Sequence, residues 1–281
     1  MKINDNIRFP ISLTNNGHLS LFFTGIGTAF SKHHYQNNLL IIKGDDHLMI
    51  DCGTKTPQAL YELGINITDI RNFLITHSHA DHIGGMEEVM LVNRYVKRQK
   101  PTIIINELFQ HLLWDLSLRG GAAFNEEHDG KNLTFGDMWN IRRPKWVQGY
   151  PRETFEIDFG TINLKMFRTK HIPENAETWE DAFWSIGLII DNRIMFTSDT
   201  LYDPDLVIEY DKIFNFETIF HDCQFFTGGV HASLEELQQL PSRYKKKMIL
   251  MHYGDNWQKY ERIVANDDFI GLGRQWSFYD F

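Results

Sequence analysis

The chain has 281 residues, of which 42% are apolar and 23% are charged, and its formal net charge is −9 at pH 7. This size and composition suit one large or two modest folded domains and exclude a disordered or fibrous chain. The acidic balance disfavours sequence-independent binding of nucleic acid, which needs clustered Lys and Arg. Bound divalent cations would make a site locally positive, so small anionic substrates stay compatible with this composition.

Short β-rich runs separated by glycines open the chain and predict a hairpin-rich sheet. They are Ser20–Thr24, Leu39–Lys43 and Leu48–Asp51. A helix is expected over Thr56–Leu63, where Gly64 ends it, and a strand over Asn72–Ile75. The polar segment Thr76–His82 is therefore expected on a strand-to-helix loop.

The middle of the chain is less regular. Helical spacing runs from Ile83 to about Lys97, and Thr102–Ile105 predicts a strand followed by a helix through Leu118. Between Gly120 and Gln148 two adjacent glycines precede a polar run and an apolar-basic patch. We expect a lid or dimer-contact insertion at about residues 120–148.

The second half repeats the β-then-α pattern of the first. Strands are expected at Phe155–Phe159, Thr161–Thr169, Phe183–Ile190, Arg193–Phe196, Thr218–Phe220 and Met248–Met251. Neither a linker nor a short-period repeat separates the halves, so we expect residues 1–281 to form a single four-layer α/β domain.

Two features of the sequence indicate the cellular compartment of the protein. Cys52 and Cys223 do not form a spaced pair, and each follows an apolar run, which is typical of buried thiols. The segment Met1–Pro10 lacks the continuous apolar stretch of a signal peptide, and no run is long enough to cross a membrane. A cytoplasmic location is expected.

The strongest chemical signal is His-Ser-His-Ala-Asp-His at positions 77–82. His77, His79, Asp81 and His82 place three imidazoles and a carboxylate within six residues, and these are the ligands that divalent transition metals need. A single pair of histidines would be better explained as a polar surface loop. Four ligand-type residues, followed by Gly84-Gly85 where the backbone can approach closely, favour a metal site.

This motif resembles the H-x-H-x-D-H hallmark of the metallo-β-lactamase superfamily, and the resemblance runs through nearly the whole chain. It implies an α/β metallo-β-lactamase fold, an αββα four-layer sandwich of two β-sheets flanked by helices. It also implies two divalent metal ions, Zn²⁺ by default with Mn²⁺ or Fe²⁺ as alternatives. By this resemblance the metal ligands are His77, His79, His171, Asp199, Asp81, His82 and His252, with Asp199 bridging both ions.

Each ligand outside the motif has a simpler explanation. His171 suits an exposed loop, Asp199 a helix cap or turn, and His252 a partly buried strand end. Two of them, however, directly follow apolar strands, Arg193–Phe196 before Asp199 and Met248–Met251 before His252, where such folds place site residues. Taken together, the ligand interpretation is favoured.

Three further segments resemble the ribonuclease Z-like branch of phosphodiesterases. They are Phe23–Phe30, Asp51-Cys52-Gly53, and Phe220–Cys223 with Gly229–Ser233. The resemblance implies that His231 protonates the leaving oxygen and that Asp222 holds it, while a metal-bridging hydroxide attacks phosphorus. Asp222 stands where Glu is expected, and His231 could instead cap the following helix. The expected catalytic residues are Asp81, His231 and Asp222.

The substrate expectation depends on the segment between His171 and Asp199. Ribonuclease Z-type enzymes usually carry a basic RNA-binding arm there, but only 27 residues separate these two positions, including Glu174, Glu177, Glu180 and Asp181. The segment Gly229–Leu237 resembles that of the anti-Pycsar cyclic nucleotide phosphodiesterases of phages and bacteria. We therefore expect hydrolysis of 3′,5′-cyclic mononucleotides to nucleoside 5′-monophosphates.

Three alternatives remain: a tRNA 3′-processing endonuclease, a glyoxalase-like thioester hydrolase, and a protein that only sequesters cyclic nucleotides. The resemblance implies a homodimer acting on a small phosphodiester, without a membrane and with nucleic acid disfavoured. Substrate-binding residues are not identified. Aromatic candidates for base stacking are Tyr35, Phe124, Trp139, Trp146 and Trp179.

Overall fold

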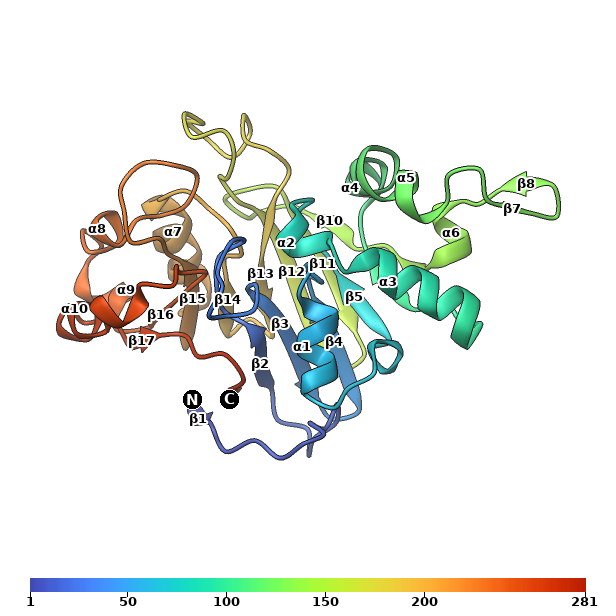
Figure 1. The fold of residues 1–281 in the computed structure, drawn as a ribbon. Helices are drawn as coiled ribbons and strands as arrows, with labels where there is room; N and C mark the ends of the chain where they lie inside the picture. The colour runs from blue at the N-terminus through green and yellow to red at the C-terminus, as the bar shows by residue number, and fades with distance from the viewer. The chain divides into compact units, whose positions relative to one another are not determined.

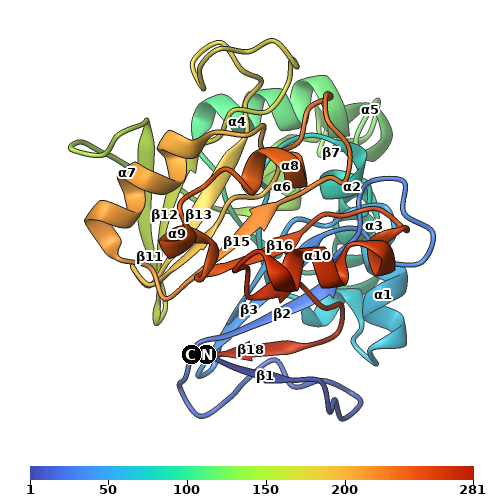
Figure 2. The ribbon, with the colours of Figure 1, turned by 90° about the vertical axis from the view of Figure 1, so that its left-hand side faces the viewer.

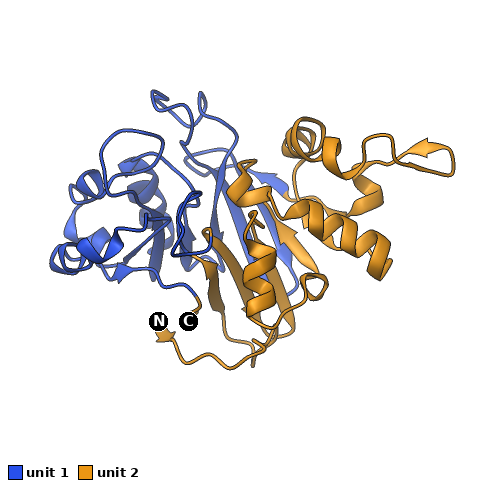
Figure 3. Cartoon of the chain, viewed as in Figure 1, with its two compact units in different colours: residues 1, 26–35, 145–275 blue, residues 2–25, 36–144, 276–281 orange.

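The computed structural model describes residues 1–281 and divides the chain into two compact units (Figure 3). Unit 1 consists of residue 1, residues 26–35 and residues 145–275, and unit 2 of residues 2–25, 36–144 and 276–281. Each unit is built around one eight-stranded β-sheet (Figure 1). The expectation of a single domain over residues 1–281 stays a prediction.

The sheet of unit 2 is antiparallel on one side and parallel on the other. In spatial order its strands are β1 (Lys2–Asn4), β18 (Phe278–Asp280), β2 (Ser20–Gly25), β3 (Asn38–Lys43), β4 (Asp46–Ile50), β5 (Asn72–Leu74), β6 (Thr102–Ile104) and β9 (Asn140–Arg142). Neighbours from β1 to β4 pair antiparallel, and those from β4 to β9 pair in parallel. The strands β2 and β3 are almost wholly buried, as near-continuous apolar runs predict.

The helices of unit 2 differ from expectation at one point. The helix predicted from Ile83 to Lys97 is interrupted, because Gly84 and Gly85 pack against the segment Gly53–Pro57 and separate two short helices. The helices and helical turns are α1 (Thr56–Glu62), η1 (Ile67–Asp69), α2 (Ala80–Ile83), α3 (Met86–Leu91), η2 (Val92–Lys97), α4 (Glu107–Leu113), η3 (Trp114–Leu118), α5 (Arg119–Ala122) and α6 (Phe135–Met138).

The segment at 120–148, which the sequence suggested was irregular, contains short strands and a short helix. A small hairpin pairs β7 (Glu127–His128) with β8 (Lys131–Asn132), and positive φ values of 52° and 73° at Asp129 and Gly130 make its tight turn. Trp139 is only 2% exposed and packs edge-on against Phe73, so it belongs to the core of unit 2. The interpretation of Trp139 as a base-stacking residue is therefore wrong.

The sheet of unit 1 repeats the same plan. Its strands are β10 (Lys145–Val147), β11 (Thr154–Phe159), β12 (Ile162–Arg168), β13 (Ile186–Ile190), β14 (Ile194–Phe196), β15 (Thr218–Asp222), β16 (Met248–Met251) and β17 (Gly271–Leu272). Neighbours from β10 to β14 pair antiparallel, and those from β14 to β17 pair in parallel. The repetition predicted for the two halves of the sequence is thus present in their sheets.

The helices of unit 1 cover one face of its sheet. They are α7 (Pro204–Phe214), α8 (Leu234–Leu237), α9 (Ser242–Lys245), η4 (Trp257–Lys259) and α10 (Glu261–Asn266). In Figure 2, α8, α9 and α10 lie together on the viewer's side of β15 and β16. Met195, Ile219 and Met248 are register partners on three adjacent strands and share one core with Leu206 and Leu237.

The two cysteines are buried, as their positions after apolar runs predict. Cys52 and Cys223 are free, fully buried thiols, and burial raises the pKa of both. Both therefore serve as small apolar side chains. Across the helices of the structure, none combines the length and apolar character that a membrane span requires.

Candidate metal centre

The motif segment of unit 2 begins on the predicted strand-to-helix loop, but its last three residues, Ala80–His82, already belong to a helix. The strand β5 ends at Leu74, the chain turns through Thr76–His79, and α2 begins at Ala80. The parallel strands β4 and β5 both end at this edge of the sheet, where open α/β sheets place their ligands. The motif loop and the loop after β4 are therefore neighbours.

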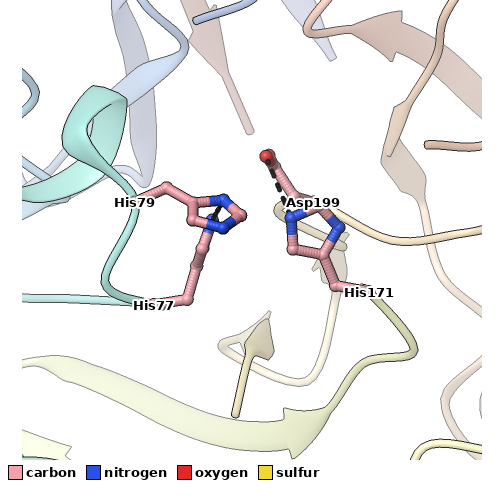
Figure 4. Close-up of side chains that lie close together, drawn as sticks. All are labelled: His77, His79, His171 and Asp199. Atoms are coloured by element: carbon pink, nitrogen blue, oxygen red, sulfur yellow. Dashed lines mark hydrogen bonds and ion pairs between the residues drawn. The ribbon is translucent and has the colours of Figure 1, made fainter. Parts of the chain in front are cut away.

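His77 and His79 direct ring nitrogens toward each other. Nε2 of His77 lies 3.1 Å from Nδ1 of His79, and the two rings meet almost at right angles (Figure 4). Two nitrogens at roughly 2.0–2.1 Å from one tetrahedral ion would be about 3.4 Å apart. The pair is thus spaced as two ligands of one metal would be.

Asp81 and His82 form a second pair in unit 2. Both are buried, and Nε2 of His82 lies 3.3 Å from Oδ2 of Asp81. The other ring nitrogen of His82, Nδ1, donates to Oδ2 of Asp51 at 2.7 Å. A carboxylate on one imidazole nitrogen makes the opposite nitrogen the more basic one and fixes the ring orientation. Nε2 of His82 is therefore the atom presented beside Asp81.

Asp51 is a functional residue that the sequence analysis missed: Asp51 was assigned to a strand end and to a segment that resembles the ribonuclease Z-like branch, without a role. Its side chain is fully buried, and its φ of 64° turns the chain sharply after β4. It also accepts the N–H and the hydroxyl of Thr76 at 2.7 and 2.8 Å. Burial raises the pKa of Asp51, and the neighbouring His82 partly offsets this. The signal available in the sequence was an Asp that directly follows an apolar strand.

The glycines around the motif permit close backbone contact. A Cβ at Gly53 would lie 2.0 Å from the carbonyl oxygen of Asp81, and one at Gly84 would lie 2.1 Å from Oγ1 of Thr54. The amide of Cys52 donates to the carbonyl of His82 at 2.8 Å. The prediction that Gly84-Gly85 allows close approach is confirmed, and this packing holds the motif loop against the loop after β4.

Unit 1 presents a second set of ligand-type residues from separate loops. His171 follows β12, Asp199 follows β14, Asp222 ends β15, and His252 follows β16. His231 lies in the loop between β15 and α8. Within this unit the donor atoms of Asp199, Asp222, His231 and His252 all lie within 4.8 Å of one another. Residues up to 53 positions apart in the sequence thus converge.

Asp199 faces two histidines within unit 1. Its Oδ2 lies 3.9 Å from Nε2 of His171 and 3.5 Å from Nε2 of His252 (Figure 4 draws the first pair). Nδ1 of His171 donates to the carbonyl of Val230 at 2.9 Å, which makes Nε2 the basic nitrogen. One carboxylate between two correctly oriented imidazoles is the arrangement that a bridging ligand needs.

Asp222 holds two imidazoles at once. Its Oδ2 lies 2.7 Å from Nδ1 of His231, and its Oδ1 lies 3.3 Å from Nδ1 of His252. Oδ2 also accepts the N–H of Thr200 at 2.8 Å. The shorter Asp side chain therefore reaches His231, despite standing where Glu was expected. Its second task, orienting His252, was not anticipated in the sequence.

Asp222 and His231 shift each other's pKa values. Burial by itself would raise the pKa of Asp222, but His231 and His252 outweigh it, and the pKa is lowered. Burial would likewise lower the pKa of His231, but the charge of Asp222 and its hydrogen bond outweigh it, and the pKa is raised. His231 is 20% exposed at its side chain, so a ligand can reach it.

The simpler explanations for His171, His252 and His231 are wrong. His171, Asp199 and His252 are at most 1% exposed, so His171 is not a surface residue and His252 is not half-buried. The helix after His231 is capped by Ser233, whose hydroxyl accepts the N–H of Glu236 at 3.2 Å. Capping therefore does not account for His231.

The donor set fits divalent metal ions. His82, His171 and His252 each have Nδ1 directed to a carboxylate or a backbone carbonyl, the arrangement found around metal-ligating histidines. The accompanying carboxylates, Asp81 and Asp199, are buried beside them. Imidazole and carboxylate ligands suit zinc, manganese or iron, so the chemistry alone leaves the metal open.

Comparisons with known proteins show close relatives. A family model described as anti-Pycsar protein Apyc1 matches residues 19–279. A protein of that name from Bacillus phage BSP38 is 36% identical over 256 residues, which cover 89% of this chain and 94% of the phage protein. Another, from Paenibacillus sp. (strain J14), is 31% identical and covers 90% of this chain and 96% of its own.

Solved structures with low sequence identity share the fold. The metallo-β-lactamase fold protein YhfI from Bacillus subtilis superposes with a TM-score of 0.68 at 13% identity, covering 94% of this chain and all of its own. A diphosphatase of the PhnP family gives 0.66 at 14% identity, covering 94% and 98%. Human tRNase Z, short form, gives 0.59 at 14% identity, covering 92% and 98%. The expected metallo-β-lactamase fold is confirmed.

Proposed function

Because the chain belongs to the anti-Pycsar protein Apyc1 family, we propose that it is a metal-dependent phosphodiesterase that hydrolyses 3′,5′-cyclic mononucleotides to nucleoside 5′-monophosphates. The family, the fold and the histidine-aspartate clusters together support the broader class, a metallo-hydrolase. The observation that carries the narrower proposal is the contact between His231 and Asp222, which provides a proton donor beside the ligand-type residues.

The proposed ligands are those that the family resemblance implies. One ion would be held by His77, His79, His171 and Asp199, and the other by Asp81, His82, Asp199 and His252. Asp199 would serve both, which is supported by its Oδ2 facing His171 and His252. The proposed metal is Zn²⁺, with Mn²⁺ or Fe²⁺ as alternatives.

In the reaction, the ions would supply an activated water and offset the charge on the phosphoryl oxygens. His231 has its Nδ1 held by Asp222, so its Nε2 is the atom that can present a proton to the leaving 3′-oxygen. The charge of Asp222 and its hydrogen bond raise the pKa of His231, against the effect of burial. Asp222 stabilises the protonated ring and fixes its orientation.

A small diester suits the charge around the site better than RNA. The segment between His171 and Asp199 carries Glu174, Glu177 and Glu180, all exposed. Exposed carboxylates repel a polyanionic backbone over roughly a Debye length, whereas a single phosphodiester presents only one charge. This supports a cyclic mononucleotide over precursor tRNA.

The test is a substrate panel assayed with metal-free protein reloaded with Zn²⁺ or Mn²⁺. Cyclic mononucleotides, linear dinucleotides, precursor tRNA and a glutathione thioester are incubated separately, and products are separated by chromatography. We expect metal-dependent release of nucleoside 5′-monophosphates from the cyclic substrates alone. Trimming of tRNA, or thioester cleavage, with cyclic nucleotides left intact would assign a different reaction. Tight binding of a cyclic nucleotide without turnover would leave only a sequestering role.

We also propose a homodimer, with the 120–148 segment at the contact. Support comes from the large apolar side chains of Leu116 and Phe124, which are 71% and 69% exposed in and beside this segment. Light scattering after size exclusion measures the mass directly. Phe124→Asp should shift a dimer toward the monomer, and a monomeric wild-type protein contradicts the proposal.

A further inference from the structure

The loop that carries His231 contains two adjacent glycines. It runs from Cys223 to Ser233, between β15 and α8, and includes Gly228 and Gly229 with φ values of 83° and 87°. Adjacent glycines lose more conformational entropy on ordering than other residues do. A proton donor on such a loop needs contacts that hold the loop in place, because displacement by about 1 Å can cost catalysis strongly.

Two sets of contacts hold the ends of this loop. The amide of Gln224 donates to the carbonyl of Ala232 at 2.8 Å, and the amide of Leu234 donates back to Gln224 at 2.8 Å. The amide of Ala232 donates to the carbonyl of Thr200 at 2.9 Å. These bonds fix the residues on the C-terminal side of His231, but they do not reach the two glycines.

The glycines are held by Glu174. The amide of Gly229 donates to Oε1 of Glu174 at 2.8 Å, and Gly228 approaches the same oxygen closely enough that an added Cβ would be 3.4 Å away. On the other side, the side chain of Gln224 donates to the carbonyl of Gly228. Glu174 lies three residues after His171, and Nδ1 of His171 bonds the carbonyl of Val230 in this same loop.

We propose that Glu174 is a positioning residue for the proton donor. Its hydrogen bond to Gly229 holds the Gly228-Gly229 turn in place, so that His231 keeps its contact with Asp222 and faces the leaving oxygen. The inference rests on the proposed function, and it gives one carboxylate of the acidic segment a task beyond charge. A carboxylate that accepts a backbone N–H makes a stronger bond than a neutral acceptor does. Its neighbours Glu177 and Glu180 have no such contact with the loop.

The test compares two leaving groups. A cyclic nucleotide releases an alkoxide, which needs a proton, whereas a p-nitrophenyl phosphodiester releases a phenolate, which departs without one. We expect Glu174→Ala to lower kcat for the cyclic nucleotide by about tenfold to a hundredfold. KM and the rate on the p-nitrophenyl diester should stay within about twofold of the wild type.

Three controls separate positioning from charge and from folding. Glu174→Gln keeps an acceptor oxygen and should restore most of the activity, and Glu177→Ala removes an equal charge and should change little. In a His231→Ala background, Glu174→Ala should cause no further loss, because the two act as one unit. An equal loss on both leaving groups, or an additive loss in the double variant, would overturn the proposal.

The outcome also distinguishes the inference from the proposed function. A wild-type protein that leaves cyclic nucleotides intact but cleaves a linear dinucleotide would contradict the proposed substrate. The dinucleotide also releases an alkoxide, so the same variants decide the role of Glu174 on it. Loss on the dinucleotide with the p-nitrophenyl diester unaffected supports the positioning role, and uniform loss rejects it.

Discussion

The two units supply ligand-type residues in opposite ways. Unit 2 contributes its four residues from one stretch of six: His77 and His79 lie in the loop after β5, and Asp81 and His82 lie in the first turn of α2. Unit 1 contributes its residues singly, from the ends of β12, β14, β15 and β16. Both sheets nevertheless follow the same antiparallel-then-parallel plan, and the donors follow the ends of strands in both.

This difference shows two routes to a metal site. In unit 2 local chain geometry brings the donors together, so the loop conformation matters most. In unit 1 the register of the parallel strands β14, β15 and β16 does so for Asp199, Asp222 and His252, because the carboxyl ends of neighbouring parallel strands meet at one edge of the sheet. The positions of these donors therefore depend on the whole sheet.

The largest expected effect tests whether the two routes serve one centre. His79→Ala in unit 2 and His252→Ala in unit 1 should each lower the rate on cyclic nucleotides by roughly a thousandfold or more, because each removes a proposed ligand. Metal content by mass spectrometry should fall in both variants. Removal of the metal from the wild-type protein with a chelator should lower its activity to the same extent.

His33→Ala is the matched control, since it removes an exposed imidazole outside both sets. If either ligand variant kept wild-type activity and metal content, that half of the ligand set would be wrong.

A smaller effect concerns the buried carboxylates that orient imidazoles. In Asp51→Asn the remaining side-chain oxygen can still accept the hydrogen bond from His82, and only the hydrogen bond from the backbone N–H of Thr76 is lost. Asp222→Asn must lose its contact with one imidazole, because a histidine faces each of the two carboxylate oxygens and the amide keeps only one oxygen. Metal affinity should fall by roughly tenfold for Asp51→Asn and roughly a hundredfold for Asp222→Asn.

Competition with a chromogenic chelator measures both affinities. Equal losses in the two variants would show that the double contact of Asp222 has no consequence.

The next effect is on stability and concerns the local packing of unit 2. Gly53→Ala places a Cβ 2.0 Å from the carbonyl oxygen of Asp81, so the backbone must shift, and the free energy of unfolding should fall by about 2 kcal/mol or more. Urea denaturation gives the value. Gly120→Ala meets nothing within 4 Å and lies in a helix, so it should raise stability by up to about 1 kcal/mol. Similar values for the two would contradict the close packing of the motif loop.

The smallest effect is an ion pair confined to the sheet of unit 1. Nζ of Lys165 lies 2.7 Å from Oε1 of Glu156, and this hydrogen bond lowers the pKa of Glu156 below 4.5, with burial partly opposing it. A carboxyl with a lowered folded-state pKa adds stability above its unfolded pKa and loses it as pH falls through the lower value. Glu156 is 32% exposed, so the contribution is less than about 1 kcal/mol.

Unfolding of the wild type and Glu156→Gln should therefore differ slightly at about pH 7 and coincide at about pH 3. A difference that persists in acid would show that the ion pair is not its source.

Much of the fold could be predicted because its signals are local. Apolar runs placed the strands, and the sequence pattern placed the start of the motif, Thr76–His79, on a strand-to-helix loop, since such patterns need only a few consecutive residues. The break at Gly84-Gly85 was missed, because it depends on contact with the segment Gly53–Pro57. Trp139 was misjudged for the same reason: its burial against Phe73 is a tertiary contact.

For the candidate site, residue types and spacing indicated which side chains carry metal-binding chemistry, and His171, Asp199 and His252 came from resemblance. The resemblance also implied the contact of Asp222 with His231, whereas only the tertiary structure showed Asp51 on His82, Asp222 on His252 and Glu174 on Gly229. The physical reason is that these bonds join residues 9 to 55 positions apart. They depend on how packed strands place their loops, and no local pattern in the chain encodes that placement.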